Sequence, residues 1–172
     1  MTHNRFIRFL ARAGIVPLAA VTVIGYSGVG HAGAATDSAT LAVAKTSLGK
    51  VLVDSNGHTL YLFKKDTGTQ SRCTDACASN WPPLLADGAP LAGSGAKASL
   101  IGTTTRPDGT SQVTYNGHPV YTFADDQKAG QTNGEGLNAF GARWFAVAPS
   151  GKQVSSQSSS GSGSNSGGGF RY

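Results

Sequence analysis

The two cysteines of this chain and two of its four histidines are residues whose types and spacing suit metal or redox chemistry. Cys73 and Cys77 lie four residues apart, and His58 and His118 each follow an Asn-Gly pair. Thiolates and imidazoles are ligands that zinc and copper prefer, so the four side chains together form one candidate metal site. An isolated cysteine pair in an exported protein instead favours a structural disulfide. In that case we expect exposed turn histidines and neither metal nor cofactor.

Two triplets of aromatic and acidic residues form a second candidate site. The alternation of a strand places the tyrosine and phenylalanine of each triplet on a common face. Packing in the core is the simplest interpretation, with each aspartate accepting hydrogen bonds from turn amides. A groove for a glycan or an apolar ligand is the alternative, and a hydrolase would use the two aspartates as a pair. The residues are Tyr61, Phe63, Asp66, Tyr121, Phe123 and Asp126.

Motifs of the common catalytic classes do not accompany these residues. The chain has no Gly-x-Ser-x-Gly, no His-Glu-x-x-His and no Gly-rich phosphate loop. Asp125, Asp126 and Glu135 gather near Asn133 without the spacing of a calcium loop, and we expect them in a solvated loop. The sequence therefore favours a protein that is not an enzyme.

The triplets belong to an internal repeat with an offset of 60 residues. Residues 56–66 read NGHTLYLFKKD, and residues 116–126 read NGHPVYTFADD. A tryptophan follows each copy, at Trp81 and at Trp144. So many matches in one register indicate an ancient duplication. Each Asn-Gly pair tolerates the positive φ angles of a tight primed turn, so we expect a β-hairpin in each copy.

The elements that must position these residues are mostly strands. A further strand is expected before each hairpin, another closes the sheet, and residues 71–79 are expected to contain one short helix. The fold class predicted is mostly β: a small antiparallel domain built from two pseudo-symmetric three-stranded repeats, with one short helix. The predicted strands cover residues 41–45, 51–53, 60–63, 100–105, 113–115, 120–123 and 144–147.

The N-terminal segment has the three parts of a secretory signal peptide. Arginines precede an apolar run over residues 15–24, and small residues follow as far as Ala34. This pattern predicts a signal peptide over residues 1–34, cleaved after Ala34 or after Ala35. The segment has no Arg-Arg pair, which favours the general (Sec) secretion route over the twin-arginine route.

The rest of the chain divides into a linker, a repeat domain and a tail. The tail is rich in Ser and Gly, so we expect it to be disordered, with its aromatic end as a candidate docking tag. Signal cleavage lowers the net charge from +5 to about +2, which is too weak to indicate a nucleic-acid partner. No integral membrane span is expected after cleavage, and we expect a monomer. The parts are linker 35–40, duplicated β domain 41–150 (repeats about 41–98 and 99–150), tail 151–172 and its end Phe170-Arg171-Tyr172.

Residues 41–150 resemble the bacterial secreted-repeat proteins of unknown function, which include predicted lipoproteins with a Tyr-x-aromatic-x-x-Asp motif. The motif is present twice, and the segment CTDACASNWPPL, residues 73–84, is similar to a Cys-x3-Cys to Trp-Pro-Pro segment of that family. The resemblance implies an extracytoplasmic bacterial protein without a settled activity, and it carries an association with growth on alkanes. This chain departs from the lipoprotein members because it has no cysteine at the cleavage site, so free secretion is expected.

These observations predict a secreted, non-enzymatic extracytoplasmic module that binds a surface or a ligand. The expected partner is an unknown cell-envelope or extracellular ligand. An accessory role in alkane use is implied by the resemblance alone. The alternative is an extracytoplasmic metal or redox protein that uses the cysteine and histidine set.

Overall fold

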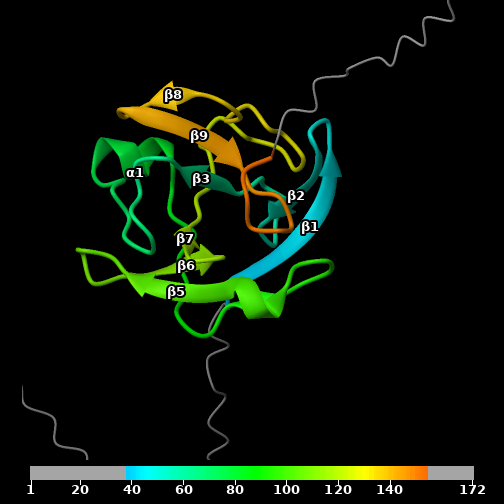
Figure 1. Ribbon diagram of the computed structural model, residues 1–172, viewed down its shortest axis with the longest axis horizontal. Helices are drawn as coiled ribbons and strands as arrows, with labels where there is room; N and C mark the ends of the chain where they lie inside the picture. Colours follow the sequence, from blue (N-terminus) through cyan, green and yellow to red (C-terminus); the bar gives the residue numbers. More distant parts are fainter. Residues whose placement is uncertain (1–37, 155–172) are drawn as a thin grey trace, which may run out of the picture. The chain divides into compact units, whose positions relative to one another are not determined.

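The computed structural model describes residues 38–154 (Figure 1). The predicted signal peptide lies outside the described residues, as does the tail beyond residue 154. Residues 151–154, the first of the predicted tail, pack against the domain. Val154 is 9% exposed, and its N–H donates to the carbonyl of Ala146 at 2.8 Å. Among residues 38–154, no helix has the length and apolarity needed to cross a membrane.

The described chain consists of short strands with one α-helix and one 3-10 turn. Few strands exceed five residues, because turn-forming Gly, Asn and Asp interrupt the apolar runs. The elements are β1 (Thr40–Thr46), β2 (Gly49–Val53), β3 (Tyr61–Phe63), α1 (Ala76–Asn80), β4 (Leu91–Ala92), η1 (Ala98–Leu100), β5 (Ile101–Thr105), β6 (Ser111–Tyr115), β7 (His118–Pro119), β8 (Asn138–Ala139) and β9 (Ala142–Ala146).

The strands form three small sheets, with orders β2-β1-β4, β3-β9-β8 and β5-β6-β7 (Figure 1). Pairing is antiparallel except between β1 and β4. The predicted fold class is confirmed: the domain is mostly β, with one short helix and two repeats. The strands expected over residues 41–45 and 100–105 are present as β1 and β5.

The two Asn-Gly turns differ in type. Asn116 and Gly117 have φ angles of 52° and 75°, so β6 and β7 are joined by the tight primed turn that was predicted. In the first copy only Gly57 has a positive φ, and the loop closes with a hydrogen bond from Asp54 N–H to the His58 carbonyl at 2.9 Å. The Asp54 carboxylate also accepts the N–H of His58 at 2.9 Å. That side chain stabilises a wider loop, so the primed turn is wrong for this copy.

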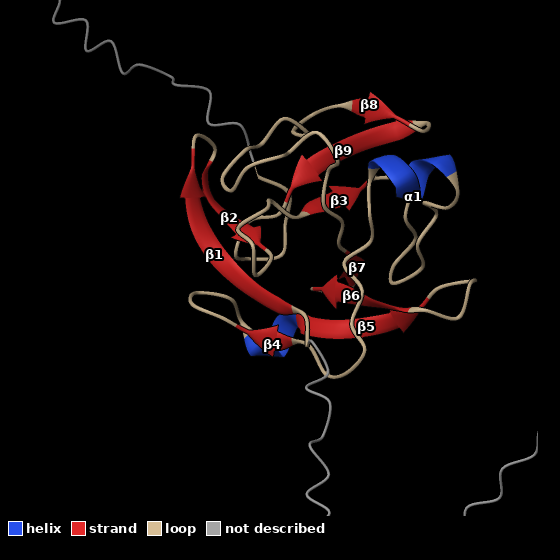
Figure 2. Cartoon of the chain, turned by 180° about the vertical axis from the view of Figure 1, so that it is seen from behind, coloured by secondary structure: helices blue, strands red, loops and turns tan. Residues whose placement is uncertain are grey.

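The repeats interlock, because β3 of the first repeat leaves its own hairpin and pairs with β9 of the second. Leu62 lies opposite Phe145, and Phe63 opposite Trp144. Figure 2 shows β3, β9 and β8 side by side, with α1 next to β3. Neither repeat therefore completes its sheet system without strands of the other.

Strand β3 separates two hydrophobic clusters. Tyr61 and Phe63 face an aromatic cluster, whereas Leu60 and Leu62 face an aliphatic one. The period of two in a strand produces this division, and it explains why every residue of β3 is buried. The motif residues thus lie at the boundary between the repeats, in the centre of the described domain.

Candidate functional site

Each motif tyrosine forms a hydrogen bond with the aspartate of the other repeat. The Tyr61 hydroxyl donates to Asp126 Oδ2 at 2.5 Å, and the Tyr121 hydroxyl donates to Asp66 Oδ2 at 2.8 Å. Between these bonds, the backbones of the two tyrosines exchange N–H···O bonds of 2.8 and 3.1 Å. The two copies of the motif therefore form one assembly with a local twofold relation.

Four stacked aromatic rings run through this assembly, and we call Phe63, Trp144, Trp81 and Phe123 the aromatic column. The two indoles are nearly parallel, with centroids 3.9 Å apart and an interplanar angle of 4°. Phe63 stacks on Trp144 at 4.0 Å, and Phe123 stacks on Trp81 at 4.2 Å. Each repeat contributes one phenyl and one indole ring, so the column obeys the same twofold relation.

The two tyrosines meet the column edge-on. Tyr61 lies against Trp81 at 5.4 Å and 81°, and Tyr121 lies against Trp144 at 5.2 Å and 86°. Trp81 is 1% exposed, and Tyr61, Tyr121 and Trp144 are fully buried. Edge-to-face contacts of this kind stabilise a core beyond the area they bury. The burial of the two tyrosines and the two tryptophans supports core packing of these four rings, whereas Phe123 is half-buried and Phe63 borders a cleft.

The Asp66 carboxylate lies at the end of the first motif in a hydrogen-bonded, half-buried setting. Its Oδ1 accepts the N–H of Arg72 at 2.7 Å, and its Oδ2 accepts the Tyr121 hydroxyl. That hydroxyl also lies 2.8 Å from Ser71 Oγ. An aspartate that closes a turn by accepting backbone amides is common, and here the turn leads into the segment that carries the cysteines.

A buried arginine supports the same turn from the second repeat. Arg106 is 5% exposed, and its Nη1 donates to Gln112 Oε1 at 2.7 Å and to Ser71 Oγ at 3.0 Å. Its Nη2 donates to the carbonyl of Cys73 at 2.8 Å. Its Nε lies 3.6 Å from the exposed carboxylate of Asp108. These acceptors offset the cost of burying the guanidinium, because a buried charge is stable only when it is paired and hydrogen-bonded. The guanidinium also places a positive charge near Asp66.

The Asp126 carboxylate has a different environment. It is 4% exposed, and its Oδ1 accepts the N–H of Asn133 at 2.9 Å. The N–H of Gly134 donates to the Tyr61 hydroxyl at 3.3 Å. Glu135 accepts a backbone N–H of β9 at 2.7 Å. The expectation of a solvated acidic loop is therefore wrong for Asp126, because the loop folds over it and the carboxylate ties that loop to the core.

Burial changes the acidity of these groups. Desolvation, followed by the nearby Asp126, raises the pKa of Tyr61, and desolvation with the charge of Asp66 raises the pKa of Tyr121. Both hydroxyls therefore stay protonated and act as donors. Desolvation also raises the pKa of Asp66 to about 6, although the Arg72 amide, the Tyr121 hydroxyl and the Arg106 charge act in the opposite direction. Asp66 thus ionises close to neutral pH.

Asp66 opens onto a cleft of about 420 Å³, which we call the seam cleft because both repeats line it. Three of its side chains are basic, namely Lys64, His118 and Lys152, against the single carboxylate. All three basic side chains are exposed. The complete lining is Leu62, Phe63, Lys64, Asp66, Asn116, His118, Gly151, Lys152 and Gln153.

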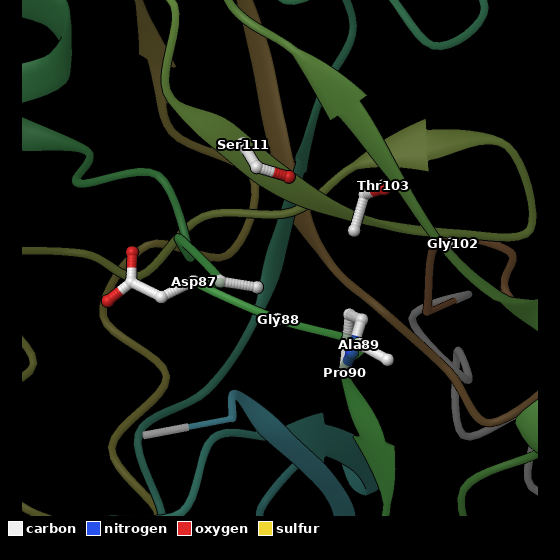
Figure 3. A pocket seen from close by; sticks show the side chains of 8 residues that line it. Asp87, Gly88, Ala89, Pro90, Gly102, Thr103 and Ser111 are labelled. Carbon is white, nitrogen blue, oxygen red and sulfur yellow. The ribbon is translucent and has the colours of Figure 1, made fainter. Parts of the chain in front are cut away.

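A second hollow, of about 390 Å³, lies over β5 and β6 (Figure 3). Its walls are mainly small residues such as Gly88, Ala89 and Gly102, together with the hydroxyl residues Thr103 and Ser111. Figure 3 shows the carboxylate of Asp87, its one charged lining residue, directed away from the space between the others. This hollow therefore offers few groups that select a ligand.

The cysteine and histidine set is not assembled. Cys73 and Cys77 form a disulfide with Cα atoms 5.2 Å apart, so neither sulfur is a thiolate ligand. His58 is half-buried and lies 3.4 Å from the Asp54 carboxylate, whereas His118 is exposed in β7. Within residues 38–154, no three His, Cys, Asp or Glu side chains gather as a metal site. The disulfide instead fixes α1, whose end positions Trp81 through the Trp81 N–H to Cys77 carbonyl bond of 2.8 Å.

Sequence reasoning identified the motif residues but not their partners. The recurrence of Trp81 as Trp144 was a signal for the aromatic column, although its offset of 63 differs from the 60 of the motifs. Arg106 and Lys152 lie outside residues 56–66 and 116–126, the two segments whose sequence recurs, so the recurrence does not mark them. Asp66 and Asp126, the candidate catalytic pair of a hydrolase, accept hydrogen bonds from different tyrosines: Asp66 from Tyr121 and Asp126 from Tyr61.

Two segments of the chain, residues 42–85 and 102–148, match the model of a family described as a secreted repeat of unknown function. Together they cover more than half of the chain, and each segment contains one copy of the motif. Comparisons with curated proteins and with solved structures give no match.

Proposed function

Since this chain belongs to the family of secreted repeats of unknown function, we propose that it is a secreted, non-enzymatic module that binds an anionic ligand in the seam cleft. The observation that carries the proposal is the lining of that cleft. Lys64, His118 and Lys152 line the cleft together with Asp66, which is itself engaged by Tyr121 and the Arg72 amide. The ammonium groups of Lys64 and Lys152 are thus available to a ligand, while the carboxylate of Asp66 is occupied by the protein.

The position of the cleft supports recognition rather than catalysis. Both oxygens of Asp66 already accept hydrogen bonds, so the carboxylate is poorly placed to act as a nucleophile or a base on a bound molecule. The other motif carboxylate, Asp126, is buried against Tyr61. The ligand we propose carries phosphate or carboxylate groups, as polymers of a cell envelope do, because lysine binds such groups as a point charge.

Nuclear magnetic resonance titration of the mature protein tests this proposal. The probes are inorganic phosphate and acetate, with neutral N-acetylglucosamine for comparison. We expect saturable shifts of the amide signals of residues 64, 118 and 152 with the anions. The double variant Lys64→Gln/Lys152→Gln should weaken binding by about tenfold, which is about 1.4 kcal/mol.

The matched control removes the same charge elsewhere. Lys45 and Lys97 are exposed and do not line the cleft, so Lys45→Gln/Lys97→Gln should leave binding unchanged. Equal weakening in both double variants would show that net charge alone attracts the anions. That result, or shifts that never saturate, would contradict the proposal.

The proposal includes export through a cleaved N-terminal signal. The intact mass of protein recovered outside the cell should correspond to a chain that begins after Ala34 or Ala35. The same mass should lack two hydrogens, because Cys73 and Cys77 are joined. A full-length mass would contradict cleavage, and a reduced chain that carries a stoichiometric metal would favour the cysteine and histidine alternative.

A further inference from the structure

We propose that the aromatic column and its two Tyr–Asp pairs form a one-electron relay, which accepts an oxidising equivalent from an extracellular one-electron oxidant and holds it as a tyrosyl radical. This activity goes beyond ligand binding in the seam cleft and uses other residues. The oxidant class comprises oxidising radicals and excited electron acceptors. Indole and phenol rings are the amino-acid side chains, apart from thiols and thioethers, that lose one electron most readily.

The column provides a continuous path between two oxidisable tyrosines. The path runs from Tyr61 to Trp81 at 5.4 Å, from Trp81 to Trp144 at 3.9 Å, and from Trp144 to Tyr121 at 5.2 Å. Electron tunnelling is fast over such separations, and parallel stacking of the indoles allows a positive charge to be shared between them. An electron can therefore move along the column without any atom being displaced.

Each tyrosine also has the base that its oxidation requires. A phenol that loses an electron becomes a strong acid, so the radical is stable only if a nearby group takes the proton. Asp126 lies 2.5 Å from the Tyr61 hydroxyl, and Asp66 lies 2.8 Å from the Tyr121 hydroxyl. The first distance is within the range of strong O–H···O⁻ bonds. Proton transfer in either pair needs only movement along an existing hydrogen bond.

The step balances in atoms and charge. The oxidant takes one electron from Trp81 and leaves its radical cation. Tyr61 then gives one electron to Trp81 while its phenolic proton passes to Asp126, which produces neutral Trp81, the Tyr61 radical and a neutral Asp126 carboxylic acid. The same exchange at the other end involves Trp144, Tyr121 and Asp66. A one-electron reductant such as a soluble phenol restores the starting state: its electron reduces the Tyr61 radical, Asp126 returns the proton to the Tyr61 oxygen, and the reductant's own proton passes to solvent.

Two further observations favour a relay over packing alone. The only Met of the sequence is Met1, and both cysteines are in the disulfide, so residues 38–154 offer neither a thioether nor a thiol as a competing site of oxidation. A buried carboxylate such as Asp126, which is 4% exposed, is costly in a core that apolar side chains could fill. Its role as a proton acceptor accounts for that cost, whereas aromatic packing does not.

Pulse radiolysis with azide radicals tests the relay in the full mature chain. We expect the absorbance of the indolyl radical to decay while that of the phenoxyl radical grows, at a rate independent of protein concentration. Replacement of water by deuterium oxide should slow this transfer, which tests the proton step without any substitution in the column or in the two Tyr–Asp pairs. In Tyr61→Phe/Tyr121→Phe the indolyl radical should persist at least about tenfold longer. All samples carry Tyr172→Phe to remove the tyrosine of the tail.

Tyr115 supplies the matched control. It is fully buried, but its hydroxyl donates to the carbonyl of Pro149 and its ring belongs to the aliphatic cluster, away from the column. Tyr115→Phe should leave the transfer rate unchanged, whereas Asp126→Asn should slow formation of the Tyr61 radical. Circular dichroism establishes that each variant is folded. Transfer that is equally fast in the double variant, or that shows no isotope effect in the protein carrying Tyr172→Phe alone, would overturn the proposal.

Discussion

The two Tyr–Asp pairs have the same sequence motif and opposite surroundings. Tyr61 and Asp126 are 0% and 4% exposed, and the remaining partners of the carboxylate and the hydroxyl are backbone amides of one loop, residues 133–134. Tyr121 is buried as well, but Asp66 is half-buried and borders the seam cleft. One pair is sealed inside the domain, and the other connects the core to the surface.

The settings differ because different chain segments follow the two motifs. After Asp66 the chain enters the disulfide segment, and Ser71 and Arg106 join the hydrogen-bond network. After Asp126 a loop without a disulfide folds back and places Gly134 on the rings. The comparison teaches that the duplication retained the exchanged Tyr–Asp bond while the outer partners diverged. The sealed pair is shielded from solvent, whereas the open pair borders the seam cleft.

The largest expected difference between the pairs is in stability. Tyr61→Phe removes a hydrogen bond from a buried carboxylate, and we expect it to lower the free energy of unfolding by about 3 kcal/mol. Tyr121→Phe should cost about 1 kcal/mol, because Asp66 keeps the Arg72 amide and has access to water. Urea unfolding of both variants measures the two losses. Equal losses would mean that the sealed and the open pair do not differ as their burial indicates.

The loop over the sealed pair gives a second test. A Cβ atom on Gly134 would lie 2.8 Å from both Trp81 Cη2 and Tyr61 Cζ, which is too close for either ring. We expect Gly134→Ala to lower the free energy of unfolding by about 2 kcal/mol through overpacking. Because Phe is smaller than Trp, the loss should be smaller when Gly134→Ala is made in a Trp81→Phe background. Additive losses in this double-mutant cycle would contradict the contact.

Loss of the disulfide should affect the segment next to the open pair, residues 66–73, more than the loop over the sealed pair, residues 126–134. It closes a short loop, so Cys73→Ala/Cys77→Ala is expected to lower the free energy of unfolding by about 2 kcal/mol. Hydrogen exchange provides the sharper measurement. Amides of residues 66–73 should exchange faster in the variant, while those of residues 126–134 should change little beyond the global loss. If amide exchange accelerates equally in both segments, the disulfide stabilises the domain as a whole and has no local effect on residues 66–73.

Local patterns predicted most strands and the disulfide, because each depends on neighbours in sequence. The strand expected over residues 120–123 is wrong: β7 covers His118–Pro119, and Tyr121 forms only isolated bridges. The offset of 60 residues revealed the duplication, and the alternation of a strand predicted that Tyr61 and Phe63 share one face, as they do in the aromatic cluster. The exchange of hydrogen bonds between repeats was not predictable in this way. Tyr61 and Asp66 are five residues apart and look like one local motif, but the partner of Tyr61 is Asp126, 65 residues away.

The turn at residues 54–58 illustrates a second limit. Asn56-Gly57 has the composition of a primed turn, but the Asp54 side chain accepts the amides of Asn56 and His58 and favours a longer loop. The seam cleft shows the same limit at larger scale. Lys152 reaches it from a segment whose composition predicts disorder, because packing of Val154 on the domain overrides that local preference.

The last expected effect is a pH dependence at Asp66, the carboxylate of the open pair. Desolvation raises the pKa of Asp66 from 3.8 in the unfolded chain to about 6, so the folded protein binds this proton more tightly than the unfolded chain does. The stabilising contribution is complete below about pH 3.8 and is lost as the pH rises through about 6. The charged and titratable groups around the carboxylate are Arg72, Arg106, Tyr121, Lys64, His118 and Lys152.

Asp66→Asn removes this titration while it keeps the shape of the side chain. The variant should therefore gain stability relative to the unaltered protein as the pH rises from about 4 to about 7, which urea unfolding at a series of pH values measures. Asp87→Asn is the control, because Asp87 is exposed and lies outside the seam cleft. Asp87→Asn should not alter the change in the free energy of unfolding between about pH 4 and about pH 7. If Asp66→Asn instead loses stability relative to the unaltered protein over this range, the folded protein stabilises Asp66 as a carboxylate, through Arg106 and the Arg72 amide. That result would contradict the expected direction of the pH dependence.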